Sequence, residues 1–180
     1  DMVWLDMSQV NNSQGMAITK AAAERHGVKT LTDLSKAAPQ LRLCSTAEFE
    51  EREDGLAGLK KRLGGFDFAS IKVFDKGIKY EVLRKGEADV NVCFTTDAAL
   101  SKGDIVAVED DIRVWPPYNL APVVRGDTLE RSPKIEDVLN KVSAALDTAT
   151  MQSLNAQVDI DQKEYKEVAS EFLKEKGLVK

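Results

Sequence analysis

The pattern of the sequence changes at the stretch Val114-Trp115-Pro116-Pro117-Tyr118-Asn119-Leu120-Ala121-Pro122-Val123-Val124-Arg125. Each proline lacks a backbone donor and holds φ near about −65°, so residues 115–122 are expected to be extended and not helical. The Pro-Pro pair acts as a stiff spacer that presents Tyr118, and Leu120 to Val124 are expected to enter a sheet. Strands alternate with helices before this stretch, whereas amphipathic helices follow it. We interpret it as a crossing between two lobes. A surface loop before an edge strand is the alternative.

Length and charge narrow the class of protein. With 180 residues the chain can form one domain or two small lobes around a buried core. The net charge is −5 and the charged residues are well mixed, so we expect no nucleic-acid partner. No apolar run approaches the roughly 20 residues that span a bilayer. The two cysteines, Cys44 and Cys93, do not fix the redox compartment.

The amino-terminal segment combines a strand with a polar cluster. Met2 to Leu5 are expected to form a buried strand that ends at Asp6, so the chain is expected to begin within the fold. This would suit an exported protein without its leader, or an excised domain. Ser8 to Gln14 are mostly polar, and a helix is predicted from about Gly15 to Arg25. Asn12 or Ser13 can cap that helix, which is the alternative to a ligand role for this cluster.

In the middle of the chain, predicted helices alternate with predicted strands. His26 precedes Gly27 and is interpreted as a charge at a helix end, not as a catalyst or ligand. The predicted helices and strands are, in order, a helix at Thr30–Ala38, a strand at Leu41–Cys44, a helix at Gly55–Leu63, a strand at Phe68–Asp75, a helix at Gly77–Lys85, and strands at Ala88–Thr95, Ile105–Glu109 and Ile112–Trp115.

Arg52 is the charged residue with the clearest candidate role. It stands among five acids, Glu48, Glu50, Glu51, Glu53 and Asp54, so a solvated charge run is one interpretation. In the other, Arg52 lies in the loop between a strand and a helix, at the sheet edge where open α/β folds bind ligands. A guanidinium there can bind a carboxylate through two parallel hydrogen bonds.

The remaining candidates suit binding and not catalysis. The sequence has no Walker loop, no GxGxxG after a strand, no HExxH and no paired CxxC, and it has one histidine. We therefore expect no enzyme, no metal and no cofactor. Arginine binds a carboxylate and aromatic faces bind a cation, which together suit a zwitterion. The polar and aromatic loop residues that could form such a site are Asp6, Ser8, Arg52, Phe94, Asp97 and Tyr118.

Several motifs in order resemble one family, the substrate-binding proteins of the glycine betaine/carnitine/choline (osmoprotectant) ABC importers. They are Val3-Trp4-Leu5-Asp6…Asn11-Asn12, Glu48-Phe49…Arg52-Glu53-Asp54-Gly55-Leu56…Gly58-Leu59-Lys60, Thr95-Thr96-Asp97, Glu109-Asp110-Asp111…Pro116-Pro117-Tyr118-Asn119…Ala121-Pro122-Val123-Val124-Arg125, Leu139-Asn140 and Val168-Ala169…Phe172-Leu173. The resemblance implies an α/β, periplasmic-binding-protein-like (type II) fold with two lobes that close on a solute.

The resemblance also implies a domain plan and a ligand site. The expected parts are 1–15 (first crossing strand and site loop), 16–113 (complete α/β lobe), 114–125 (second crossing) and 126–180 (helical carboxyl-terminal part of the other lobe). Arg52 matches the arginine that binds the ligand carboxylate, and Phe94 and Tyr118 match walls of an aromatic cage. Ser8 stands where glycine betaine binders tend to place another aromatic, and Ala98 replaces a usual glycine. The expected ligand-binding residues are Asp6, Ser8, Asn11, Arg52, Phe94, Thr95, Asp97 and Tyr118.

The functional prediction is a solute-binding component of an ABC importer that binds a quaternary-ammonium or related zwitterion and delivers it to a membrane permease. A ligand-sensing domain of the same fold, fused to a permease or receptor, is the alternative, and an enzyme of this fold comes third. The resemblance implies an extracytoplasmic location, periplasmic or anchored at the cell surface.

Two further expectations concern packing. Helices at 133–146, 148–157 and 162–176 carry apolar stripes that two short crossing strands cannot cover. We therefore expect another chain, a domain swap or a further segment to complete the carboxyl-terminal half, and 16–113 to fold by itself. Cys44 and Cys93 lie on strands expected in one small parallel sheet, where neighbouring side chains bridge poorly, so two buried thiols are favoured over a disulfide.

Overall fold

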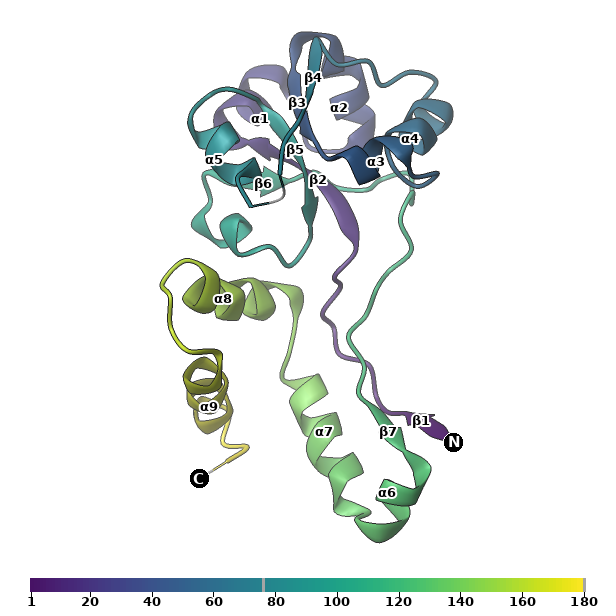
Figure 1. Ribbon diagram of the computed structural model, residues 1–180, viewed down its shortest axis with the longest axis vertical. Coiled ribbons are helices and arrows are strands. Elements are labelled where there is room, and N and C mark those ends of the chain that lie inside the picture. Colours follow the sequence, from purple (N-terminus) through teal and green to yellow (C-terminus); the bar gives the residue numbers. More distant parts are fainter. Residues whose placement is uncertain (76, 180) are drawn as a thin grey trace. The chain divides into compact units, whose positions relative to one another are not determined.

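The computed structural model describes residues 1–75 and 77–179, which divide into two compact units. Unit 1 comprises Asp1–Asn12, Thr96–Ser101 and Pro117–Lys180, and unit 2 comprises Ser13–Thr95 and Lys102–Pro116. The segment Thr96–Ser101 thus belongs with the carboxyl-terminal part, although it lies inside the 16–113 range expected to form one lobe. Figure 1 shows the elements of both units.

Unit 2 is built on a five-stranded sheet with the order β4-β3-β5-β2-β6 (Figure 1). β3 is parallel to β4 and to β5, whereas β2 is antiparallel to β5 and to β6. The sheet is therefore mixed, and the expected parallel sheet is limited to three strands. The strands are β2 (Gln14–Thr19), β3 (Arg42–Ser45), β4 (Ser70–Val73), β5 (Val90–Phe94) and β6 (Ile105–Ala107).

The prediction of a helix from Gly15 to Arg25 is wrong over its first part. Residues Gln14–Thr19 form β2, and helix α1 begins only at Lys20 and ends at His26. Met16, Ala17 and Ile18 are fully buried between β5 and β6, so burial in the sheet outweighs the helical pattern. The cap is accordingly Thr19, whose side chain accepts from the Ala22 N–H, and not Asn12 or Ser13.

Short helices surround this sheet. α2 is capped by Thr30 and Asp33, each of which bonds the backbone N–H of the other. Leu31, Leu34, Leu43, Phe66 and Val90 are among the buried side chains of the core. The helices are α2 (Leu31–Ala37), η1 (Ala38–Gln40), α3 (Ala47–Glu51), α4 (Leu56–Leu63) and α5 (Lys79–Arg84). A further short helix, η2 (Ala98–Lys102), belongs to unit 1 except for its last residue.

The strand expected at Ile112–Trp115 is also wrong, because this segment turns. The Asp110 carboxylate accepts from the backbone N–H groups of Val114 and Trp115, both at 3.0 Å. Arg113 has a positive φ of 52°, which a strand does not allow. Trp115 is buried in the core of unit 2, so the turn places the residue before Pro116 inside this unit.

Unit 1 contains the two predicted crossing strands. β1 (Met2–Trp4) pairs antiparallel with β7 (Val123–Arg125), and Asn11 forms an isolated bridge to Asn119. Residues 115–122 contain no helix, as predicted, but the strand after them begins at Val123 and not at Leu120. Four helices follow: α6 (Gly126–Arg131), α7 (Lys134–Ala144), α8 (Thr148–Asp159) and α9 (Tyr165–Glu175). Across the described ranges, every helix is too short or too polar to cross a membrane.

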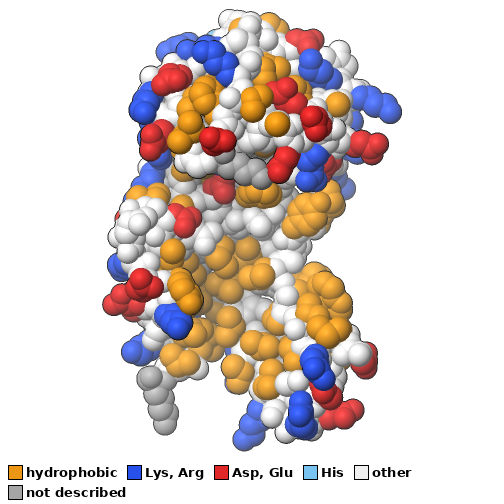
Figure 2. Space-filling view, viewed as in Figure 1, with side chains coloured by type: hydrophobic (Ala, Val, Ile, Leu, Met, Phe, Trp, Pro, Cys, Tyr) orange, Lys and Arg blue, Asp and Glu red, His pale blue; other side chains and the backbone are white. Residues whose placement is uncertain are grey.

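Unit 1 buries little and exposes much apolar surface. Its buried cluster contains Val10, Leu146 and Phe172. Trp4 is 73% exposed and Tyr165 is 63% exposed, and hydrophobic side chains gather in the lower part of Figure 2, over unit 1. The other large hydrophobic residues of this unit that are exposed are Met2, Met7, Tyr118, Leu120, Val123, Val138, Ile160 and Val179.

Candidate functional site

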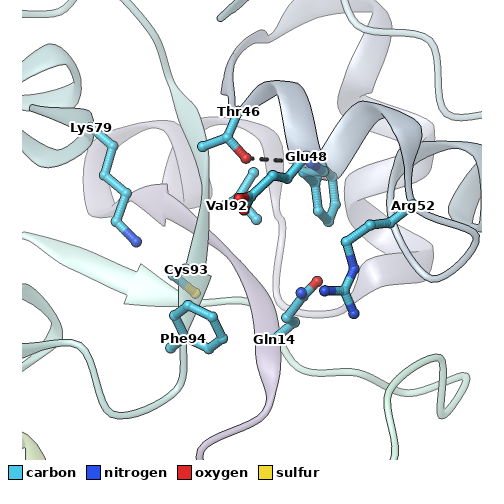
Figure 3. Close-up of a pocket in the computed structure, with 9 residues that line it drawn as sticks. Gln14, Thr46, Glu48, Arg52, Lys79, Val92, Cys93 and Phe94 are labelled. Atoms are coloured by element: carbon cyan, nitrogen blue, oxygen red, sulfur yellow. Dashed lines mark hydrogen bonds between the residues drawn. The ribbon is translucent and has the colours of Figure 1, made fainter. Parts of the chain in front are cut away.

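A pocket in unit 2 lies where several strands and helices end (Figure 3). It brings together Arg52 and Phe94, two of the residues expected to bind a ligand, although they are far apart in the sequence. Polar, charged and apolar side chains share its lining. The lining residues are Gln14, Thr46, Glu48, Phe49, Arg52, Lys79, Val92, Cys93 and Phe94.

Arg52 owes its position to helix α3. The Thr46 side chain caps this helix by accepting from the Phe49 N–H, and the Arg52 N–H bonds the Glu48 carbonyl at its other end. The run 48–54 is therefore not a plain loop, because a helix of one to two turns stands before Arg52. Arg52 follows that helix and reaches the pocket from the segment between α3 and α4.

The Arg52 guanidinium is held by Asp54. Nε lies 2.7 Å from Oδ1 and Nη2 lies 2.7 Å from Oδ2. This pair lowers the pKa of the Asp54 carboxyl, chiefly through the hydrogen bonds that Arg52 donates. The Trp115 indole N–H donates to the Asp54 carbonyl at 2.8 Å, so the segment that carries Arg52 is tied to the core. A guanidinium has five N–H donors, and Asp54 occupies two of them.

Phe94 forms the aromatic part of the pocket. It ends β5 opposite Gln14, the first residue of β2, and it is 42% exposed. The Lys79 ammonium lies 6.0 Å from the centroid of the Phe94 ring and 5.0 Å from that of Tyr80. The face of Phe94 thus has a cation near it already, at a distance typical of cation–π contacts.

The side-chain amide oxygen of Gln14 is the next feature of the pocket. This atom, Oε1, is buried and, within residues 1–75 and 77–179, has no hydrogen-bond partner. The sequence patterns do not single out Gln14 or Lys79 as ligand-binding residues. Gln14 falls within a polar cluster that predicts a helix cap. The signal that could have found Gln14 is the buried run Met16-Ala17-Ile18, which marks a strand that Gln14 opens at the same sheet edge as Phe94.

The cysteines lie near this pocket. In the part of the chain that the structure describes, Cys44 and Cys93 are buried and form no disulfide, and Cys93 lines the pocket. Burial raises the pKa of the Cys44 thiol to about 11, although Lys79 opposes the shift. Cys44 is therefore a protonated core side chain at neutral pH.

Thr95 follows Phe94 and forms hydrogen bonds between the ends of β5 and β2. Its N–H donates to the Ser13 carbonyl at 3.1 Å, and its hydroxyl donates to the same oxygen at 3.4 Å. These bonds join the residue before β2 to the residue after β5. Thr95 therefore fixes the strand ends on which Gln14 and Phe94 stand.

The other expected residues lie in unit 1. Ser8 is 2% exposed, and its hydroxyl donates to the Leu120 carbonyl and accepts from the Val10 N–H. Asn11 accepts from the Tyr118 N–H at 2.8 Å through Oδ1. These contacts hold the two extended segments of unit 1 against each other. Asp6 and Ser8 line a second pocket with Asn119 and Asn140, and the Asp6 N–H donates to Asn140 Oδ1.

Asp97 and Tyr118 complete the expected set. The Asp97 carbonyl accepts from the Leu100 N–H in the turn that opens η2. Tyr118 is 48% exposed. Among the described residues, no three His, Cys, Asp or Glu side chains are grouped so that they could hold a metal ion.

Comparison with known proteins identifies the relatives of this chain. The sequence pattern of the OpuAC family, described as the substrate binding domain of the ABC-type glycine betaine transport system, matches residues 1–175. A glycine-betaine-binding protein of Pseudomonas aeruginosa is 31% identical over 188 residues, which cover 99% of this chain and 60% of that protein. The Helicobacter pylori protein named ergothioneine transport permease/ergothioneine binding protein EgtU is 30% identical, over 99% of this chain and 32% of that protein.

A solved structure shares the fold. The crystal structure of a glycine betaine/carnitine/choline ABC transporter protein superposes with a TM-score of 0.93 at 31% identity, covering 99% of this chain and 65% of that chain. This likeness confirms the expected fold class, an α/β fold of the type II periplasmic-binding-protein class, represented in part. The chain spans 60% of the Pseudomonas protein that it matches.

Proposed function

This chain belongs to the family of substrate-binding domains of ABC-type glycine betaine transport systems, and from that premise we propose that it binds a small zwitterionic solute for an ABC importer. The solute class is a quaternary-ammonium compound of the glycine betaine, choline or carnitine type, or a related zwitterion. The chain acts by binding and release, without catalysis. The protein works outside the cytoplasmic membrane and delivers its solute to a membrane permease.

The observation that carries the proposal is the pairing of Arg52 with Phe94 in one pocket. Arg52 supplies charged donors for a carboxylate, and the Phe94 ring supplies a face for a cation. A zwitterion such as a betaine carries a carboxylate and a cationic group a short distance apart. The one histidine of the sequence, His26, ends α1 and does not line this pocket, which supports binding without acid–base chemistry.

The role of the unit 1 residues is part of the proposal. We assign ligand contacts to Tyr118, Asp6 and Asp97. Ser8, Asn11 and Thr95 hold the backbone that presents their neighbours, as their hydrogen bonds favour. Tyr118→Phe should bind the solute nearly as well as the wild type and Tyr118→Ala should bind it more weakly, because a cage uses the face of the ring.

The exposed apolar surface of unit 1 supports a further part of the proposal. Trp4, Val138 and Tyr165 are each more than half exposed, at 73%, 55% and 63%. Soluble proteins seldom leave so many large hydrophobic side chains in water on one small unit. We assign this surface to contact with additional polypeptide, supplied by a further segment or by exchange between two copies.

Native mass spectrometry of protein purified without denaturation tests the proposed function. We expect a bound small molecule with a carboxylate and a cationic group, which leaves when the protein is unfolded and refolded. A bound nucleotide, a redox cofactor or a chemically altered solute would contradict the proposal. The refolded protein then provides the ligand-free sample for titration.

A further inference from the structure

The buried Gln14 Oε1 atom points to one chemical feature of the solute. Gln14 lines the pocket beside Phe94 and Arg52, and in Figure 3 its amide is seen between the guanidinium and the ring. Within the described ranges this oxygen has no hydrogen-bond partner. A buried acceptor without a donor lowers the stability of the fold, and native proteins leave few of them.

The surroundings of Gln14 in the pocket explain why its side-chain oxygen is left without a donor in the protein. Gln14 opens β2 and stands opposite Phe94 in the antiparallel register, so its position follows from the sheet. The two cationic side chains of the pocket have other contacts, since Arg52 bonds Asp54 and Lys79 lies near the rings of Tyr80 and Phe94. A donor brought by a bound solute would satisfy the oxygen only in the complex, where it adds to affinity.

We infer that the solute of this pocket carries an N–H or O–H group that donates to Gln14 Oε1. This inference rests on the proposed function. Glycine betaine cannot make the bond, because its trimethylammonium group has no N–H and its carboxylate is ionised. The hydroxyl of carnitine, the protonated amine of dimethylglycine and the ring N–H of ergothioneine can each make it. The preferred solute is therefore a zwitterion with a hydrogen-bond donor between its carboxylate and cationic ends or on its cationic group.

One pair of probes isolates this bond. Dimethylglycine and glycine betaine differ by a single exchange of N–H for N–CH₃ and share the carboxylate and the positive charge. Titration calorimetry on refolded protein should give dimethylglycine an affinity about tenfold higher than that of glycine betaine, since a hydrogen bond from a charged donor is worth about that factor. Carnitine is the second donor-bearing probe.

Two variants assign the effect to Gln14. Gln14→Met keeps the length of the side chain and removes the acceptor, so the preference for dimethylglycine should vanish. Gln14→Glu keeps an acceptor and has no donor, so it should retain or increase the preference, which identifies the oxygen as the working atom. Gln40→Met changes an exposed glutamine of η1 and should leave both affinities unchanged.

A stability readout shows that the variants fold. Because Gln14→Met removes an unpaired buried group, its ligand-free melting temperature should equal or exceed that of the wild type. A wild-type protein that binds glycine betaine as tightly as dimethylglycine, or a preference that persists in Gln14→Met, would overturn the inference and leave the proposed function standing. Failure of every betaine, amine and carnitine probe to bind would contradict both.

Discussion

Arg52 and Asp54 form a two-point ion pair, with Nε and Nη2 of the guanidinium each 2.7 Å from a carboxylate oxygen. The two residues stand on one turn of chain between α3 and α4, and the indole of Trp115 holds the carbonyl of the same Asp54. Asp54 therefore fixes the plane of the guanidinium before any solute arrives. Preorganisation of this kind reduces the entropy lost when the solute binds.

The Trp115 indole is the first testable contact. Trp115→Phe keeps a buried ring and removes the 2.8 Å hydrogen bond to the Asp54 carbonyl. We expect the free energy of unfolding to fall by about 1 kcal/mol and solute affinity to fall as the Arg52 segment loosens. Urea unfolding and calorimetry measure the two effects. Trp4→Phe is the matched control because Trp4 is exposed, and an equal loss in the control would refute this role for the indole.

Gly55 tests the packing behind Arg52. A Cβ built at Gly55 would collide with the backbone carbonyl of Phe49, which a flexible side chain cannot relieve. Gly55→Ala should therefore cost roughly 1–3 kcal/mol of stability and displace Arg52 from the pocket. Gly77→Ala is the control, since a Cβ there meets no atom within 4 Å. Thermal melts that show the same midpoint for both variants would refute this account of the turn.

The pH dependence of stability should contain a contribution from Asp89. Arg42 donates to this carboxylate from Nε, Nη2 and its backbone N–H, each at 2.9 Å, and these bonds lower the pKa of Asp89. The folded pKa lies below the unfolded one, so the stabilisation is present above the unfolded value and is lost as pH falls through the folded value. Because the Arg42 side chain is 43% exposed, the effect should not exceed about 1 kcal/mol.

Asp89→Asn should flatten the loss of stability with acid below about pH 4, where unfolded aspartate titrates. Chemical unfolding at several pH values measures the slope. Asp67→Asn removes an exposed partner of Lys60 and serves as the control, with little change expected. A slope that stays the same in Asp89→Asn would show that other groups govern the acid response.

The apolar surface of unit 1 predicts uneven protection from hydrogen exchange. In the chain 1–180 alone, amides of α7 should exchange faster than those of β2 and β5, because no apolar side chain of α7 is buried and Val138 is 55% exposed. Size-exclusion chromatography with light scattering should show association if copies cover this surface. A monomer with strongly protected amides throughout 133–176 would contradict the proposal that added polypeptide covers it.

Much of this architecture could be predicted from local sequence rules. The prolines at 116, 117 and 122 predict a segment without helix, and the apolar runs at Met2–Leu5 and Leu120–Val124 predict the two strands that the structure pairs as β1 and β7. The strands at β3, β5 and β6 were visible as short apolar runs. Arg52 and Phe94 could be placed at one sheet edge because Phe94 lies at the carboxyl end of one predicted strand and Arg52 in the segment between another strand and the next helix.

What escaped prediction depends on contacts that are distant in sequence. Residues Gln14–Thr19 have the composition of a helix as well as of a strand, and only their burial between β5 and β6 decides between them. The turn at 110–115 depends on one carboxylate that bonds two backbone groups further along the chain. Gln14 and Lys79 were missed for the same reason, since neither has a local pattern that marks a pocket.

The most direct test of the whole account is the affinity of carnitine for the wild type and for Arg52→Ala, with Arg25→Ala as an exposed arginine control. Arg52→Ala/Asp54→Ala belongs in the same series, because it removes the carboxylate that the single variant leaves without its arginine. Calorimetry should show Arg52→Ala and the double variant binding about 10 to 100 times more weakly than the wild type, and Arg25→Ala binding equally well. A dissociation constant that is the same in the wild type, Arg52→Ala and Arg25→Ala would contradict the account.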